Sequence, residues 1–110
     1  NMLYADPANA GYQRIAAAYK QAHNQEPNEI LVPFYDGVNV LLHAIQRAGT
    51  VDDTAKVAAA FSQVLPMRSV QGENLKLGGA SNYGADAQIM TVNYIGVIRN
   101  GGPVVLGRTK

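Results

Sequence analysis

The chain has 110 residues and a formal net charge of +1, because nine lysines and arginines nearly balance eight aspartates and glutamates. This length allows one modest domain, and the absence of a basic run argues against binding of nucleic acid or an anionic membrane. Cysteine is absent, which excludes disulfides, thiolate metal sites and cysteine nucleophiles. No window reaches the roughly 18 consecutive apolar residues that a membrane span requires.

The first predicted element is a helix over residues 10–23. Asn9 precedes this Ala-rich segment and can accept a hydrogen bond from an amide of the first turn. The apolar positions at helical spacing predict one buried face, made of Ile15, Ala18, Tyr19 and Ala22. Residues 24–28 contain Pro27, which cannot continue a helix, so the sequence predicts a break there.

A second helix is predicted to begin either at Glu29 or at Pro33 and to end at Gly49. Its apolar stripe, which we expect to be the buried one, consists of Phe34, Val38, Leu41, Leu42 and Ile45. Its polar stripe consists of Asp36, Asn39, His43, Gln46 and Arg47. A third helix is predicted from Thr54 to about Leu65, with Asp52–Asp53 at its start and Pro66 at its end. It would bury Val57, Ala60, Phe61 and Val64.

After residue 66 glycines divide the chain into short pieces, and residues 73–77 alternate as a short strand does. Residues 89–98 are rich in Ile, Val, Thr and Tyr, with apolar side chains on both faces, which predicts a strand covered on both sides. Residues 100–102 are typical of a hairpin turn, and residues 103–106 predict a short return strand.

The residues that could carry chemistry are scattered. His23 and His43 lack the spacing of a metal site, and Asp52–Asp53 is explained by helix capping. The glycine-rich segment 78–84 lacks both phosphate-binding and dinucleotide-binding motifs, so we interpret it as a loop. No serine lies in a nucleophile elbow. The sequence therefore predicts no enzyme, no metal and no cofactor.

Two aromatics and an acid, Phe34, Tyr35 and Asp36, open the second predicted helix. Phe34 belongs to the apolar stripe, whereas Tyr35 lies beside it. From the residues alone, Tyr35 is either ordinary packing or an aromatic that lines a cleft, and both interpretations stay open.

Several segments follow one another in a characteristic order. An aromatic-spaced helix (12–19) and a proline break precede Tyr-Asp-Gly-Val (35–38) and Ala-Ile-Gln-Arg-Ala-Gly (44–49). An acid-started helix (52–61), Val-Gln-Gly (70–72), a short strand with a glycine turn (75–79) and a strand with an Asn-Gly hairpin (92–101) come next. From residue 12 onward this order resembles the C-terminal third of a type I periplasmic solute-binding protein, in the branched-chain amino-acid branch of ABC importer receptors. Gly37 where the family has Ala, Pro33 near the Tyr-Asp, and the missing Asp around residues 77–79 depart from the family pattern.

The resemblance implies an α/β fold of two lobes that close on a small ligand. Residues 1–110 would be a single C-terminal fragment, with a helical part at about 8–65 in one lobe and a strand part at about 70–107 that crosses the hinge. The abrupt opening at Asn1 is expected of a chain cut from a longer protein. The parent would be periplasmic or extracellular, bind an amino acid or similar small carboxylate, and pass it to a membrane permease.

For the site, the resemblance implies that Tyr35 lines the ligand cleft, with Phe34 and Asp36 as weaker candidates. Because strands covered on both faces would lose their neighbours in a fragment, we also expect exposed apolar surface and self-association. One alternative is a free-standing α+β interaction domain that pairs through residues 89–98. A small hydrolase or transferase is a further alternative, supported only by isolated Ser, His and Asp residues.

Overall fold

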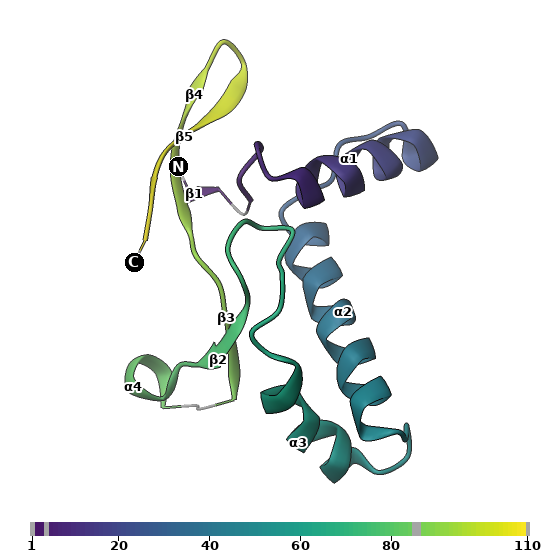
Figure 1. The fold of residues 1–110 in the computed structure, drawn as a ribbon. Helices are drawn as coiled ribbons and strands as arrows, with labels where there is room; N and C mark the ends of the chain where they lie inside the picture. The colour runs from purple at the N-terminus through teal and green to yellow at the C-terminus, as the bar shows by residue number, and fades with distance from the viewer. Residues whose placement is uncertain (1, 4, 85–86, 110) are drawn as a thin grey trace.

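A computed structural model describes residues 2–3, 5–84 and 87–109. The helices are α1 (Ala10–His23), α2 (Leu31–Ala48), α3 (Thr54–Val64) and the short α4 (Ala80–Tyr83). The strands are β1 (Met2–Leu3), β2 (Lys76–Gly78), β3 (Gln88–Met90), β4 (Tyr94–Arg99) and β5 (Gly102–Arg108). Figure 1 shows α1, α2 and α3 on one side and the strands on the other, with the β4–β5 hairpin extending away from α3. The predicted order, three helices followed by short strands and a hairpin, is confirmed.

Local capping fixes the helix ends where the sequence predicts them. The Asn9 side chain accepts a hydrogen bond from the Tyr12 amide at 2.9 Å, and α1 ends at Asn24 in the left-handed conformation, with φ 53°. Gly49 ends α2 with φ 70°. Asp53 accepts a hydrogen bond from the Lys56 amide at 3.0 Å and starts α3, which confirms the capping interpretation of this acid.

The start of α2, which the sequence left open, lies midway between the two alternatives, with Pro33 in the first turn. The Asn28 side chain accepts hydrogen bonds from the amides of Ile30 and Leu31, at 3.1 and 2.9 Å, and the helix begins at Leu31. Pro33 is then the third helical residue. Its missing N–H costs no hydrogen bond, because amides of the first turn have no intrahelical partner.

The predicted buried face of α2 is wrong. The buried residues are Val32, Asp36, Val40 and Ala44, on the opposite side of the helix. The predicted stripe is largely exposed, with Phe34 at 68% and Leu42 at 55% of their possible exposure. The reason is the position of the neighbours: α3 packs against α2, and the segment 69–71 is hydrogen-bonded to Asp36.

The other two long helices bury fewer residues than predicted. In α1, Ile15 is buried, whereas Ala18 and Ala22 are exposed. Ile15 joins a small core with Ala5, Val32 and Val70, against which Tyr12 packs. In α3, Ala60 is buried and the remaining predicted core residues, Val57, Phe61 and Val64, are half-buried.

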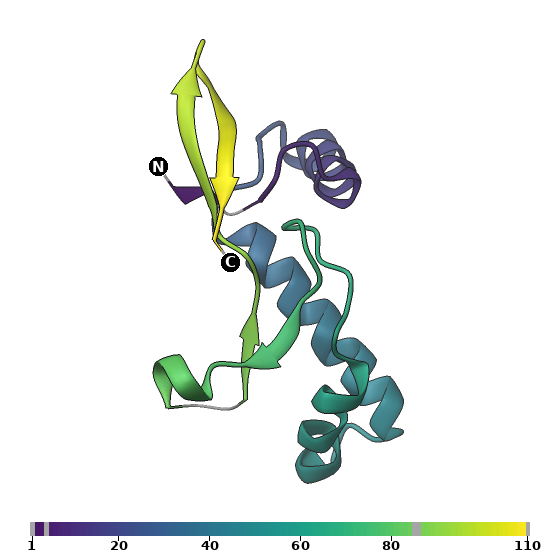
Figure 2. The ribbon, with the colours of Figure 1, turned by 60° about the vertical axis from the view of Figure 1, so that its left-hand side comes forward.

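The strands form two antiparallel groups. In the first, β4 lies between β1 and β5, and in the second β2 pairs with β3. The turn that joins β4 to β5 has Asn100 at φ 52° and Gly101 at φ 78°, which confirms the predicted hairpin. Figure 2 shows this hairpin extending away from α3. Its residues Ile98 and Pro103 border a hollow together with Tyr12 of α1 and Val32 of α2.

Three predictions for residues 73–98 need correction. The strand predicted at 89–98 is divided into β3 and β4, with residues 91–93 outside both. Within this chain β4 is not covered on both faces, since Ile95 and Ile98 are 50% and 54% exposed while Tyr94 and Gly96 are buried. Exposed apolar surface of this kind is expected above for strands without their neighbours. The strand predicted at 73–77 lies at 76–78, and the segment 78–84 contains α4 instead of being only a loop.

Candidate functional site

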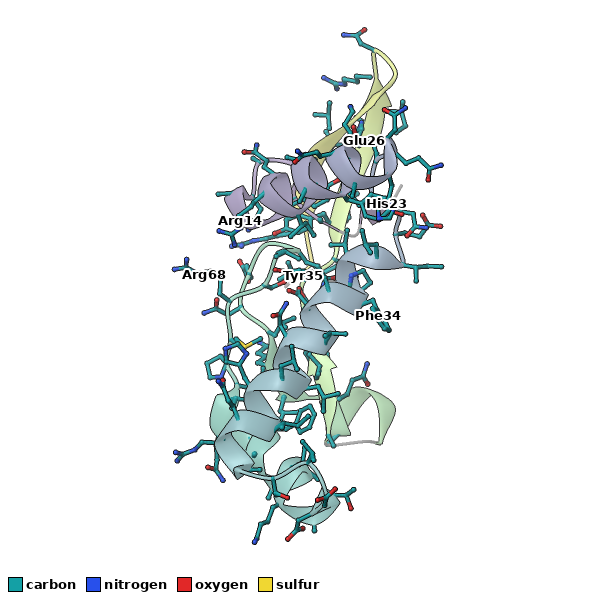
Figure 3. All side chains as sticks on the ribbon, turned by 90° about the vertical axis from the view of Figure 1, so that its right-hand side faces the viewer. Arg14, His23, Glu26, Phe34, Tyr35 and Arg68 are labelled. Carbon is teal, nitrogen blue, oxygen red and sulfur yellow. The ribbon has the colours of Figure 1, made fainter. Side chains whose placement is uncertain are left out.

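A cleft of about 530 Å³ lies between the first turn of α1, the middle of α2 and the segment 67–74. Its lining includes Arg14 from α1, Tyr35 and His43 from α2, and Arg68 from the segment that follows α3. In Figure 3 Arg14 and Arg68 extend toward the same side of the molecule, Arg14 from α1 and Arg68 from the segment below it. The cleft therefore brings together residues from three parts of the chain that are distant in sequence.

Asp36 builds one wall of this cleft. Its carboxylate accepts hydrogen bonds from the Ser69 hydroxyl at 2.5 Å, the Val70 amide at 3.0 Å and the Gln71 side-chain amide at 2.9 Å. The Ser69 hydroxyl in turn accepts a hydrogen bond from the Gln71 amide at 2.9 Å. Asp36 is only 3% exposed, so its charge is matched by these donors, which fasten the segment 69–71 to α2.

Of the predicted site residues, Tyr35 and Asp36 line the same cleft, whereas Phe34 does not. Tyr35 is 40% exposed and also borders an apolar hollow of about 380 Å³ with Ile15 and Tyr19 of α1. Phe34 borders a separate hollow of about 340 Å³ beside Ile30. The ligand-binding roles of Phe34, Tyr35 and Asp36 stay predictions.

The sequence predicted only Tyr35 and Asp36 of the residues that line the cleft, and the polar or charged residues that it missed include Arg14, Asn39, His43 and Arg68. The Asn39 side-chain amide donates a hydrogen bond to the Tyr35 carbonyl at 2.9 Å, and the His43 Nδ1 is 2.8 Å from the Asn39 carbonyl. Since a carbonyl can only accept, Nδ1 carries the proton of this contact. Helical spacing from Tyr35 places Asn39 and His43 on one face, but nothing in the sequence pointed to Arg68.

The described lining of the cleft holds two arginines, Arg14 and Arg68, and one acid, Asp36. Neither Arg14 nor Arg68 has an acid partner among the described residues, whereas Lys20 pairs with Glu26 and Arg108 with Glu73. Asp36 also lines the cleft, but its carboxylate already accepts hydrogen bonds from Ser69, Val70 and Gln71. The described residues hold no group of three or more His, Asp or Glu side chains that could bind a metal ion. In the same part of the chain no helix is long and apolar enough to cross a membrane.

Comparison with known proteins identifies the family. A family model described as "Periplasmic binding protein" matches residues 1–103. The chain belongs to this family. The leucine-binding protein LivK from Thermotoga maritima has a similar structure, with a TM-score of 0.70 and 21% sequence identity. The similarity covers 97% of this chain and 29% of that chain, and a search of curated proteins gave no match.

The two comparisons confirm the type I periplasmic binding protein resemblance and the α/β fold class. The members of this family bind solutes. The chain spans 29% of the length of the LivK chain. The cleft between α1, α2 and the segment 67–74 is accordingly one part of a periplasmic binding protein fold.

Proposed function

We propose that this chain is the C-terminal portion of an extracytoplasmic solute-binding protein that delivers an amino acid or similar small carboxylate to an ABC permease in the membrane. The observation that carries the proposal is the family match over residues 1–103, and the similarity to a leucine-binding protein supports the ligand class. The parent would be periplasmic or extracellular. It would bind its ligand reversibly and catalyse no reaction.

In this proposal residues 1–110 form one fragment of a two-lobed receptor. The helical part, at about 8–65, belongs to one lobe, and the strand part, at about 70–107, crosses the hinge to the other. The extension of the β4–β5 hairpin away from α3 supports this division. A closing cleft between lobes excludes water and strengthens each polar contact with the ligand.

Tyr35 is the residue of this chain that we expect to contact the ligand. It is 40% exposed and borders both the 530 Å³ cleft and the apolar hollow beside α1, so its ring can cover an apolar part of a ligand. Asp36 would act by holding the segment 69–71 in place, and Phe34 would contribute only where the other lobe closes over it.

The test uses the product of the whole open reading frame that contains this sequence. Titration calorimetry with leucine, isoleucine, valine, phenylalanine and glutamate measures the dissociation constant of each. We expect at least one amino acid to bind and Tyr35→Ala to weaken its binding by about tenfold. Val51→Ala, on an exposed residue in the α2–α3 connection, is the control and leaves affinity unchanged. A product that binds none of these ligands would contradict the proposal.

A further inference from the structure

Two guanidinium groups face a cleft whose described lining holds one acid, Asp36, which forms no ion pair with either of them. Arg14 and Arg68 both line the cleft, both are exposed, and neither has an ion-pair partner in the part of the chain that the structure describes. Figure 3 shows them extending toward the same side of the molecule. A guanidinium presents a planar fork of N–H donors that matches a carboxylate, so two of them at one cleft favour an anionic group.

The start of α1 adds donors to the same cleft. Asn9 caps the Tyr12 amide, but the amides of Ala10 and Gly11 have no acceptor among the described residues, and both residues line the cleft. Unpaired amides at the beginning of a helix carry partial positive charge and bind anions. They therefore reinforce the preference that the two arginines create.

The cleft offers no free carboxylate to a cation. Asp36 is the only acidic residue among its lining residues, and it is 3% exposed with hydrogen bonds from Ser69, Val70 and Gln71. An α-carboxylate has an ammonium group one carbon away, which would approach Arg14 and Arg68 without an acid to bind it. A carboxylate distant from any ammonium avoids this repulsion.

We propose that the cleft binds a side-chain or non-amino carboxylate between Arg14 and Arg68, so that the ligand is acidic, as glutamate or a small dicarboxylate is. This inference rests on the proposed function and deepens it, because it specifies the ligand class of the same cleft. Tyr35 then covers the carbon chain of the ligand, and the Ala10 and Gly11 amides donate to the carboxylate.

The experiment titrates the ¹⁵N-labelled product of the whole open reading frame that contains this sequence with glutarate, L-glutamate, L-leucine and inorganic phosphate at low salt. The amide resonances of Ala10 and Gly11 report on occupancy. We expect both acids to shift these resonances and to bind at least about tenfold more tightly than leucine or phosphate. Arg14→Gln and Arg68→Gln each weaken glutarate binding by about tenfold or more.

Arg99→Gln is the matched control, because it removes the same charge from an exposed arginine of β4 outside the cleft. Its glutarate affinity stays within about twofold of the unmodified chain, since distant exposed charges are largely screened. Unchanged resonances elsewhere in each variant spectrum show that the fold is intact. Both cleft arginines are exposed, so neither substitution leaves a cavity.

Equal affinities for glutarate and leucine, tighter binding of phosphate, or unaltered glutarate binding in both arginine variants would overturn the inference. Absence of binding by all four probes would overturn it as well. The whole open reading frame product decides the proposed function separately: if it binds leucine independently of Arg14 and Arg68, the receptor function stands and only the acidic ligand is wrong. If the whole product binds glutarate through these arginines and binds no amino acid, the acidic ligand class stands and the amino-acid receptor is wrong.

Discussion

Asp36 connects α2 to the segment that follows α3. Its carboxylate binds three donors from residues 69–71, which lie 33 to 35 positions away in the sequence. The sequence suggested a polar surface residue or a weak ligand contact for Asp36, because an acid on a helix is usually exposed. A single sequence does not contain the information that three donors converge on it.

Replacement of Asp36 by alanine tests this role. The variant leaves the Ser69 hydroxyl, the Val70 amide and the Gln71 side chain without their buried acceptor, so we expect the free energy of unfolding to fall by about 3 kcal/mol. Urea unfolding followed by circular dichroism measures the loss. Asp52→Ala, which removes an exposed acid, is the control and changes stability by no more than about 0.5 kcal/mol. Equal stabilities for the two variants would show that the hydrogen bonds of Asp36 stabilise nothing.

The raised pKa of Tyr94 makes the stability of the chain depend on pH in the alkaline range. Burial of its hydroxyl and the nearby negative charge of Asp6 raise the pKa of Tyr94 above the ordinary value of 10.0. Below about pH 9 both the folded and the unfolded states keep this proton, and stability is unaffected. Above about pH 10 the unfolded state loses it first, so the free energy of unfolding falls. Urea unfolding at about pH 9 and about pH 11 should show a smaller loss in Tyr94→Phe than in the unmodified chain, and equal losses would refute this effect.

At the scale of elements, the ends of the helices were predictable and their buried faces were not. Asn9, Gly49 and Asp53 act within one turn of their own position, so local chemistry determines where α1, α2 and α3 begin or end. In α2 both faces are apolar. The sequence favoured the wider stripe around Phe34, but α3 and the segment 69–71 cover the face around Val40.

Replacement by alanine should have opposite effects on stability at two glycines, Gly37 in α2 and Gly72 in the segment that follows α3. A Cβ at Gly37, within α2, meets nothing within 4 Å, so Gly37→Ala should raise the free energy of unfolding by about 0.5–1 kcal/mol through helix propensity. Gly72 has φ +149°, and a Cβ there would overlap the Tyr94 hydroxyl. Gly72→Ala should lower stability by about 2 kcal/mol or more. Thermal and urea unfolding of both variants measure the two shifts, and effects of the same sign would contradict this assignment.

At the scale of the whole molecule, the chain is thin, with principal extents of 49 × 36 × 18 Å, and it leaves two apolar surfaces open. One is the outer stripe of α2, with Phe34, Leu41 and Leu42, and the other is on the hairpin, with Ile98 and Leu106. The sequence predicted open apolar surface on the strands, where Ile98 and Leu106 are exposed, but it predicted that the α2 stripe is buried. The sequence shows which residues are apolar but not which neighbours are present. The lining of the cleft was also only partly predictable. Tyr35 belongs to a local sequence motif, whereas Arg68 lies at the cleft because the fold brings the segment after α3 next to α2.

The exposed stripe of α2 should drive association of the isolated chain. Phe34 is 68% and Leu42 55% exposed on one helix face, and burial of such side chains contributes about 1.5–3 kcal/mol each. We expect light scattering to find a dimer or larger species. Phe34→Ser combined with Leu42→Ser should shift it toward monomer while the far-ultraviolet circular dichroism stays the same, since neither side chain belongs to the core. Val51→Ser, at 69% exposure outside α2, is the matched control and keeps the association. If the unmodified chain is monomeric at high concentration, the exposed stripe of α2 does not drive association and the prediction is wrong.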